Sequence, residues 1–343
     1  MRTLGLINDP VYRETAHSGL DQFFIGFLKD KRDLPFIYLI IRILVIHIPL
    51  AAALFFLTGT TWWIAAAVYT ILVILAAGPF TLMLHNTSHR VLFKREYKWA
   101  NRLIPWALCP FVGQSPDTYF SHHIGMHHAE NNMHEDLSST LRFQRDSFVD
   151  FLRYFGRFIM IGIWELIYYF QKRSKRKLMR RALIGELGFY AFIGTLLYLN
   201  PLPAFLIFIV PVLLVRFFMM AGNWAQHAFI DAATPENNYR NSITCINNDY
   251  NKKCFNDGYH IGHHLRPHMH WTDMPNDFLK NAQEYARQKA VVFEGLDYNQ
   301  IWFYLVTKNY GRLADHFVNI NGSYGTKEEV MALLRERTKR IEG

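Results

Sequence analysis

The chain has few cysteines, and their arrangement does not support a disulfide framework. Three cysteines, Cys109, Cys245 and Cys254, occur in 343 residues, and no two have CxxC spacing. An odd number without that spacing favours reduced thiols, in the membrane or the cytoplasm. The sequence also contains no internal repeat and no low-complexity segment. Residues 1–34 are polar and mixed in charge, so we expect no cleavable signal peptide before the first apolar run.

Apolar residues, in contrast, are abundant and clustered. Hydrophobic residues make up 51% of the chain and aromatic residues 16%. Four apolar runs cover residues 35–58, 62–84, 182–199 and 202–222. Because about 20 helical residues cross a hydrocarbon core of about 30 Å, each run is predicted to span a membrane. Only residues 59–61 and 200–201 separate the two members of each pair, which predicts two helical hairpins.

The basic residues predict how these spans are oriented. The net charge is +9, and the segment between the two hairpins ends in a basic run at residues 172–181. The hairpin tips at 59–61 and 200–201 contain no Lys or Arg. The positive-inside rule therefore places the N-terminus, this long segment and the C-terminal region in the cytoplasm. Basic residues beside spans fit anionic lipid headgroups or an acidic partner better than nucleic acid.

Two further apolar stretches are not predicted to cross the membrane. Residues 103–112 are too few and contain two prolines, which favours a re-entrant or interfacial segment. Residues 148–170 carry scattered charges and are predicted to form an amphipathic helix in the interface. Within the first span, Arg42 is expected to snorkel to the cytoplasmic interface, whereas His47 lies too deep to join other histidines easily.

Histidine is the residue type that carries the chemical signal. Eight of the sixteen histidines lie in three boxes, which read HNTSH, HIGMHH and HIGHH. The box histidines are His85, His89, His123, His127, His128, His260, His263 and His264. Residues three and four apart share a helix face, so each box can aim two or three imidazoles at one point. One HxxxH pair is weak evidence, but three boxes beside apolar spans predict a metal centre at a membrane face.

The number of imidazoles predicts two metal ions. A zinc site takes three or four protein ligands, which eight imidazoles exceed. Asn223 and His227 share a helix face just after the fourth span, so His227 is a candidate ninth imidazole and Asn223 a direct or water-mediated ligand. A hydrogen-bonding feature at a helix end is the alternative for this pair. An all-nitrogen set without obvious bridging carboxylates suits redox iron, which with O2 can attack an unactivated methylene.

These observations predict an all-α integral membrane protein with four transmembrane helices in two hairpins and a cytoplasmic helical cap that carries a histidine-rich di-metal site. Five regions follow along the sequence. They are a cytoplasmic segment (1–34), hairpin 1 (35–84), a cytoplasmic or interfacial region with boxes 1 and 2 (85–181), hairpin 2 (182–222) and a cytoplasmic region with the NxxxH element and box 3 (223–343).

The order HxxxH, HxxxHH, HxxHH resembles the membrane fatty-acid desaturase and hydroxylase superfamily. The resemblance covers roughly residues 85–275 and the preceding spans, and it is most specific at 256–275, NDGYHIGHHLRPHMHWTDMP. It implies two non-haem irons, O2 as co-substrate and an acyl or other lipid substrate. The implied ligands are His85, His89, His123, His127, His128, His227, His260, His263 and His264, with Asn223 as a further candidate.

Two features depart from the pattern of many desaturases. Box 2 has three residues before its paired histidines where many desaturases have two, a variant shared with several hydroxylases. The leading prediction is a fatty-acyl desaturase, with a hydroxylase of the same superfamily as the alternative. No fused cytochrome b5 segment with an HPGG-type motif is present, so we expect a separate ferredoxin or cytochrome b5-type donor to dock on the basic cytoplasmic face.

Two other functions fit parts of the sequence. A zinc-dependent membrane hydrolase would use three histidines and a carboxylate, fewer imidazoles than the boxes supply. A metal transporter or sensor would place ionisable residues in mid-span rather than at span ends.

Polar residues near the boxes have two interpretations. His122, His134, His268 and His270 are expected beside the site or at the surface. Acidic residues can orient ligand imidazoles or be solvated, and the candidates are Glu130, Glu135, Asp136, Asp231 and Asp257. Trp224 and Tyr259 either line the substrate path or act as interfacial anchors.

Overall fold

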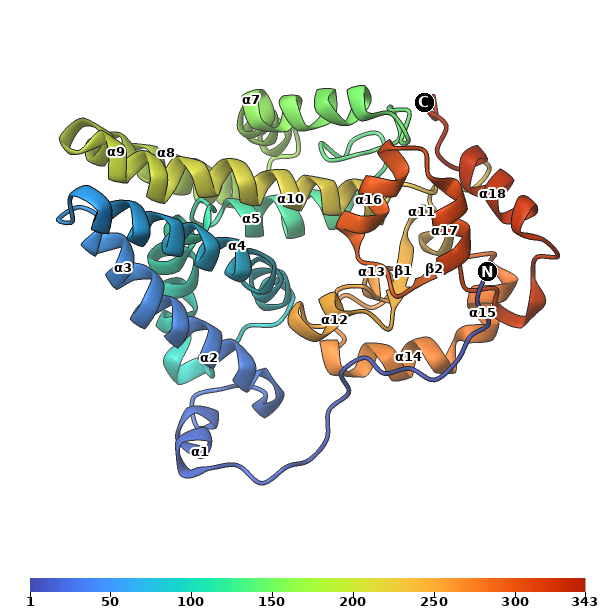
Figure 1. Cartoon of the computed structure of the whole chain (residues 1–343), viewed down its shortest axis with the longest axis horizontal. Helices are drawn as coiled ribbons and strands as arrows, with labels where there is room; N and C mark the ends of the chain where they lie inside the picture. Colours follow the sequence, from blue (N-terminus) through green and yellow to red (C-terminus); the bar gives the residue numbers. More distant parts are fainter. Residues whose placement is uncertain (343) are drawn as a thin grey trace. The chain divides into compact units, whose positions relative to one another are not determined.

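The computed structural model describes residues 1–342, which are mostly helical (Figure 1). The chain divides into two compact units. The span unit consists of residues 13–125 and 166–217, and the α/β unit consists of residues 1–12, 126–165 and 218–343. Three helices contain points at which the chain passes between the units. They are η6 (His123–His127), α7 (Phe148–Lys172) and α10 (Val210–Gln226).

Four helical segments in residues 1–342 are long and apolar enough to cross a membrane. They are Lys31–Ala53, Gly59–His89, Arg176–Leu199 and Pro201–Gln226. The first consists of η1 (Lys31–Asp33), α2 (Leu34–Arg42), η2 (Ile43–His47) and α3 (Ile48–Ala53); the second is α4 and the third α8; the fourth joins α9 (Pro201–Ala204), η7 (Phe205–Ile209) and α10. The four predicted spans are confirmed as candidate membrane helices, with shifted bounds, and their pairing into hairpins stays a prediction.

Helix α4 continues beyond its predicted end at residue 84 and includes the whole of box 1. The polar residues of HNTSH satisfy their own hydrogen bonds within the helix. Asn86 donates to the Leu82 carbonyl at 2.8 Å, and Ser88 donates to the Leu84 carbonyl at 2.7 Å. These bonds to the preceding turn let polar residues extend an apolar helix. Box 1 is therefore the last turn of the second span.

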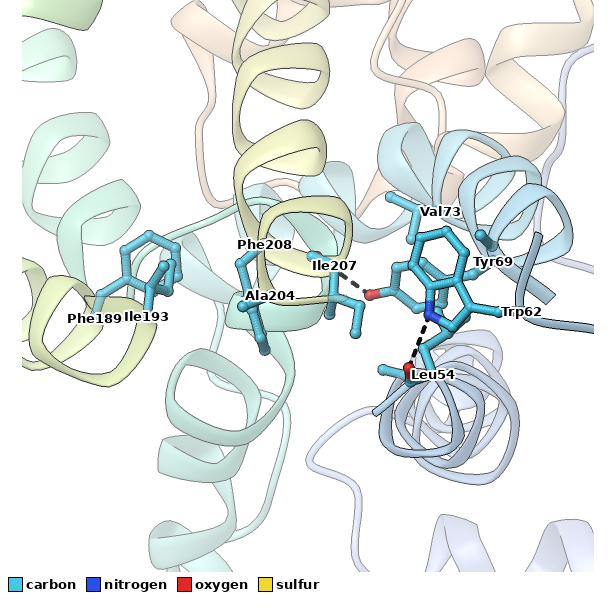
Figure 2. Close-up of a cluster of buried hydrophobic side chains, with 11 residues drawn as sticks. Leu54, Trp62, Tyr69, Val73, Phe189, Ile193, Ala204, Ile207 and Phe208 are labelled. Atoms are coloured by element: carbon cyan, nitrogen blue, oxygen red, sulfur yellow. Dashed lines mark hydrogen bonds between the residues drawn. The ribbon is translucent and has the colours of Figure 1, made fainter. Parts of the chain in front are cut away.

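Aromatic side chains on α4 hold the core of the span unit together (Figure 2). Trp62 donates its indole N–H to the Leu54 carbonyl at 2.9 Å. Tyr69 is fully buried, and its hydroxyl lies 3.1 Å from the Phe111 carbonyl and 3.5 Å from that of Ile207. Buried aromatic polar atoms usually find such partners. These contacts join α4 to the fourth span and to the segment that precedes box 2.

The two shorter apolar stretches are not among the candidate spans within residues 1–342. Residues 104–112 form two short turns, η4 (Ile104–Leu108) and η5 (Cys109–Val112). Gly113 follows with φ +72°, and a Cβ there would collide with the Pro211 carbonyl of α10. Glycine is thus required where the segment that contains Gly113 meets α10.

The remaining helices of the span unit are α1 (Gly19–Ile25), η3 (Arg95–Arg102) and α5 (Thr118–His122).

The α/β unit contains a two-stranded sheet, so the all-α prediction is wrong in this respect. β1 (Ile243–Ile246) pairs in parallel with β2 (Val291–Glu294). Both strands are four residues long, rich in β-branched residues and almost completely buried. Such runs cannot be distinguished from buried helix by periodicity. The unit's other elements are α6 (His128–Glu130), α11 (Asn238–Asn241), α12 (Asp249–Lys253), α13 (His260–Leu265), η8 (Trp271–Asp273), α14 (Met274–Lys280), α15 (Ala282–Arg287), α16 (Tyr298–Val306), α17 (Tyr310–His316), η9 (Ile320–Gly322) and α18 (Lys327–Glu336).

The sheet and box 3 share one hydrophobic core. Tyr259 and Ile261, which flank His260, pack with Ile246 of β1 and Val292 of β2. Tyr259 also donates its hydroxyl to the buried carboxylate of Asp9 at 2.7 Å. The N-terminal segment and the sheet therefore fix the position at which α13 begins.

Candidate metal centre

The span unit brings three predicted ligands together. His85 and His89 lie one turn apart in the last turn of α4, and His123 begins η6 directly after α5. The ring centroids of His85 and His123 are 4.5 Å apart. The Nε2 atoms of His89 and His123 lie 2.9 Å apart. These three residues are called the triad below. Imidazole nitrogens at this separation share a proton or a cation, which is the arrangement expected of metal ligands.

Box 2 lies on a π-helical turn rather than on the regular α-helix that its spacing predicts. Its glycine is packed on the span unit. A Cβ on Gly125 would lie 2.7 Å from Leu178 Cδ1 and 3.0 Å from Phe170 Cε1. Lys175 donates to the Gly125 carbonyl at 2.8 Å. A larger residue would displace the turn that carries the box 2 histidines, and π turns of this kind are frequent at functional sites.

Four histidines of the α/β unit form a second group, called the quartet. It consists of His127, His227, His260 and His264, and one ligand nitrogen of each lies within 4.8 Å of the others. The Nε2 atoms of His227 and His260 are 3.2 Å apart, and those of His260 and His264 are 3.0 Å apart. Three separate segments supply these residues: the end of η6, the turn after α10, and α13. Residues far apart in the sequence thus converge on one point.

Two histidines of the quartet, His227 and His264, are in the protonation state that metal binding requires. Burial lowers the pKa of His227 to about 4, and the proximity of His127 adds to this effect. Burial also lowers the pKa of His264 well below its usual value, with a further contribution from the neighbouring imidazoles. Both side chains are therefore neutral near pH 7, and a neutral imidazole has a nitrogen lone pair available for a metal. The donor set fits a borderline transition metal such as iron.

The paired histidines of boxes 2 and 3 serve different groups. His128 and His263 form a pair in the α/β unit, with Nε2 atoms 2.9 Å apart. Their sequence neighbours His127 and His264 belong to the quartet. Successive helical residues point about 100° apart, because an α-helix has 3.6 residues per turn. An HH pair can therefore supply ligands to two groups, which a single-metal site would not need.

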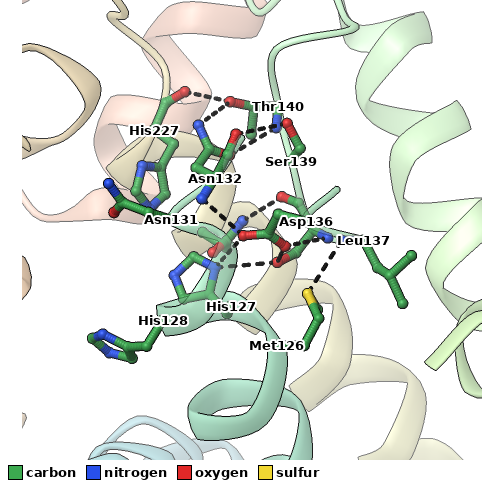
Figure 3. Close-up of polar contacts among 12 residues, drawn as sticks. Met126, His127, His128, Asn131, Asn132, Asp136, Leu137, Ser139, Thr140 and His227 are labelled. Atoms are coloured by element: carbon green, nitrogen blue, oxygen red, sulfur yellow. Dashed lines mark hydrogen bonds and ion pairs between the residues drawn. The ribbon is translucent and has the colours of Figure 1, made fainter. Parts of the chain in front are cut away.

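Among the five acidic residues considered from the sequence, Asp136 contacts a quartet histidine directly (Figure 3). It is fully buried, and its Oδ2 accepts from His127 Nδ1 at 2.8 Å and from the Asn132 backbone N–H at 2.9 Å. Its Oδ1 accepts from the backbone N–H and the hydroxyl of Ser138, at 2.8 and 2.7 Å. When Nδ1–H donates to this carboxylate, Nε2 of His127 is the nitrogen that faces the quartet.

His227 is held in a similar way by residues that the sequence analysis did not identify. Its Nδ1 lies 2.9 Å from the Asn241 carbonyl and 3.1 Å from Asn241 Oδ1. Thr140 donates its hydroxyl to the His227 carbonyl at 2.6 Å. Asn132 donates from its side chain to Asn241 Oδ1 at 2.9 Å, which joins the supports of His127 and His227 in one network. Asn and Thr in loops carry no distinctive spacing, so no sequence signal indicates these roles.

The other predicted residues have different surroundings. Asn223 donates from Nδ2 to the Ser138 carbonyl at 3.1 Å and to the Tyr154 hydroxyl at 2.7 Å, and its role as a ligand stays a prediction. Trp224 is fully buried and donates to the Arg145 carbonyl, so it belongs to the interior of the α/β unit.

The remaining acids and flanking histidines mostly hold local structure. Asp257 accepts from Gln226 and Tyr250, and Asp231 pairs with Arg240 and Arg337. Among the flanking histidines, His270 caps η8 with its side chain. His134 and His268 are exposed, as expected for surface residues.

Comparison with known proteins gives one match. A family model described as fatty acid desaturase matches residues 60–295, which is more than half of the chain. No curated protein and no solved structure gave a match.

Proposed function

The chain belongs to the fatty acid desaturase family, and we propose that it is a non-haem di-iron enzyme that oxidises an unactivated C–H bond of a lipid with O2. The family implies an oxidoreductase with a lipid substrate in a membrane context, and the four apolar helices agree with a membrane protein. The observation that carries the di-iron part is the quartet, because it brings four imidazoles to one point and burial keeps two of them, His227 and His264, neutral.

We assign one iron to the quartet and the other to the triad. The two predicted histidine ligands that belong to neither group, His128 and His263, keep the role of ligands that the sequence predicts. Bound iron would supply the reduction of O2 and an oxidant able to remove hydrogen from a methylene. The chain's own contribution is to fix the imidazoles. Asp136 and Asn241 hold His127 and His227 by their far nitrogens, which favours Nε2 as the ligand atom.

We further propose a multi-pass arrangement with both termini and the metal centre on the cytoplasmic side. The support is the contrast between the basic run at 172–181 and the uncharged tips at 59–61 and 200–201. Electrons would come from a separate acidic ferredoxin or cytochrome b5-type protein that docks on this basic face.

Desaturation is the leading reaction, and hydroxylation is the second candidate. The specific observation that favours the second is box 2, where three residues precede the paired histidines and the backbone forms a π turn. Both reactions begin with removal of hydrogen from a methylene. In desaturation a second hydrogen is then removed from the neighbouring carbon, whereas in hydroxylation a hydroxyl group is added to the carbon that lost the first hydrogen.

Lipid mass spectrometry with metal analysis tests this proposal. Cells would express the wild-type chain, His127→Ala, or the control His134→Gln, which changes an exposed histidine outside the boxes. We expect about two irons per wild-type and control chain, and less iron in His127→Ala. A product that lacks two hydrogens would indicate desaturation, and one with an added oxygen would indicate hydroxylation. Identical lipid profiles for all three strains would refute the oxidase, and one zinc per chain would favour a hydrolase.

A further inference from the structure

A buried carboxylate lies within the third span and takes no part in the metal centre. Glu186 belongs to α8, and its side chain is 5% exposed. Because a helix rises about 1.5 Å per residue, Glu186 lies roughly 7.5 Å beyond Arg181, the last cation of the basic run. An ionisable residue at such a position is costly in a bilayer and is usually retained for a function.

Side chains from two other segments meet Glu186. Ser115, in the loop between η5 and α5, donates its hydroxyl to Glu186 Oε1. Arg216 of α10 lies 3.7 Å from the same oxygen and donates to Ser115 Oγ at 3.1 Å. The loop fits closely against α8, because a Cβ on Gly185 would collide with the Pro116 carbonyl. The three polar side chains are therefore fixed by backbone packing within the span unit.

The second carboxylate oxygen of this cluster lacks a partner. Glu186 Oε2 is buried, and no hydrogen-bond donor reaches it among residues 1–342. Buried polar atoms are nearly always hydrogen-bonded, and leaving one unpaired is costly. A donor from outside the chain would satisfy it. Glu186 and Arg216 carry opposite charges, so a neutral donor fits this site better than an ammonium or a carboxylate group does.

We propose that Ser115, Glu186 and Arg216 bind a neutral hydrogen-bond donor of the lipid substrate, either a hydroxyl or an amide N–H. This assignment rests on the proposed lipid oxidase, because it identifies a polar group of that enzyme's substrate. Ser115 precedes His123 of the triad by eight residues, and the short helix α5 connects them. A lipid held at Ser115 and Glu186 would therefore be anchored at a fixed position relative to the triad. The substrate class is a lipid alcohol or amide rather than a free acid or a simple ester.

Binding of matched probes to the purified full-length protein tests the site. The probes are hexadecanol, hexadecanamide and methyl hexadecanoate, which share a chain length and differ in whether they carry a donor. Their retention is measured by gel filtration and mass spectrometry without O2 or reductant, so the result does not depend on turnover. We expect the alcohol, the amide or both to bind about tenfold more tightly than the ester, equivalent to about 1.4 kcal/mol. Whichever of these two probes binds more tightly shows whether the donor is a hydroxyl or an amide N–H.

The double variant Glu186→Leu/Arg216→Leu removes both charges together and so avoids an unpaired buried ion. It should bind all three probes equally, with the affinity for the ester unchanged. The matched control Arg157→Leu/Glu165→Leu removes another Glu–Arg pair, on α7, and should keep the tenfold preference. Equal binding of the probes by the wild type, or a preference that survives in the Glu186 variant, would overturn the assignment. If iron binding and lipid oxidation persist in that case, only this site is refuted and the proposed function stands.

Discussion

Replacement of Asp136 by asparagine should separate orientation of a ligand from its presence. The carboxylate accepts four hydrogen bonds: from His127 Nδ1, from the Asn132 backbone, and two from Ser138. Asparagine keeps one acceptor oxygen and places an NH2 group where the other was. Whichever way the amide turns, two of the four donors then face another donor.

The magnitude follows from the loss of those two bonds. A hydrogen bond to a charged group contributes about 1.5–3 kcal/mol, so Asp136→Asn should lower the free energy of unfolding by about 3 kcal/mol or more. If the NH2 group faces His127, the Nδ1 atom of His127 becomes the acceptor and its proton moves to Nε2. Nε2 is the proposed ligand atom, so its lone pair is then no longer available to the metal. Loss of such a support typically weakens metal affinity by about 10- to 100-fold.

Iron retention against a competing chelator measures the second effect, and thermal melting of the metal-depleted protein measures the first. Ser138→Ala is the matched control: it removes one hydroxyl donor to Asp136 but leaves the carboxylate bonded to His127. The control loses one bond to the carboxylate instead of two, so it should lose about 1.5–3 kcal/mol of stability and retain iron like the wild type. If Asp136→Asn holds iron as tightly as the control does, Asp136 does not orient His127 and the reasoning is wrong.

Three further predictions concern the metal centre and the core that supports it. Gly125→Ala should lower the melting temperature and the iron content, because its Cβ would lie 2.7 Å from a neighbouring side chain. The control Gly262→Ala, whose Cβ would have no atom closer than 3.6 Å, should match the wild type in both measurements. Equal losses in the two variants would contradict the packing argument. A double-mutant cycle of Asp9→Asn and Tyr259→Phe should give a coupling energy of about 1–2 kcal/mol in unfolding experiments, since both are buried and share a 2.7 Å hydrogen bond; additive effects would show that the bond contributes nothing. The pKa of His227 is about 4 when folded and about 6.5 when unfolded, so its contribution to stability is present above about pH 6.5 and lost as the pH falls toward 4. The melting temperature of metal-depleted protein should therefore fall more steeply between pH 7 and 5 in the wild type than in His227→Gln; parallel slopes would refute this.

The sequence was sufficient to predict the features that depend on local pattern. The four spans follow from uninterrupted apolar length, and the helical position of box 1 follows from HxxxH spacing. His227 could be identified because NWAQH directly follows an apolar run. These features require only the period of a helix and the thickness of a bilayer, both of which are fixed by general physical chemistry.

Features that depend on long-range packing could not be predicted. The strands β1 and β2 are four residues each, and their pairing joins segments more than forty residues apart. The π turn at box 2 follows from how closely Gly125 approaches α8 and α7, which no local pattern encodes. Asp136 was one of five equivalent acids in the sequence, and only the fold shows that it reaches His127.

The division of the HH pairs has a mechanistic consequence. His127 and His264 belong to the quartet, while His128 and His263 form a separate pair, so boxes 2 and 3 each supply two groups from adjacent residues. Box 2 also supplies His123 of the triad, four residues before His127 on η6, so a movement of box 2 displaces ligands of the quartet and of the triad together. Because Asp136 and Asn132 fix box 2 through one buried network that also reaches His227, loosening this network should weaken the binding of both irons, not only the one held by the quartet. A chelator titration of Asp136→Asn that releases both irons in one step would support such coupling, and release of a single iron would exclude it.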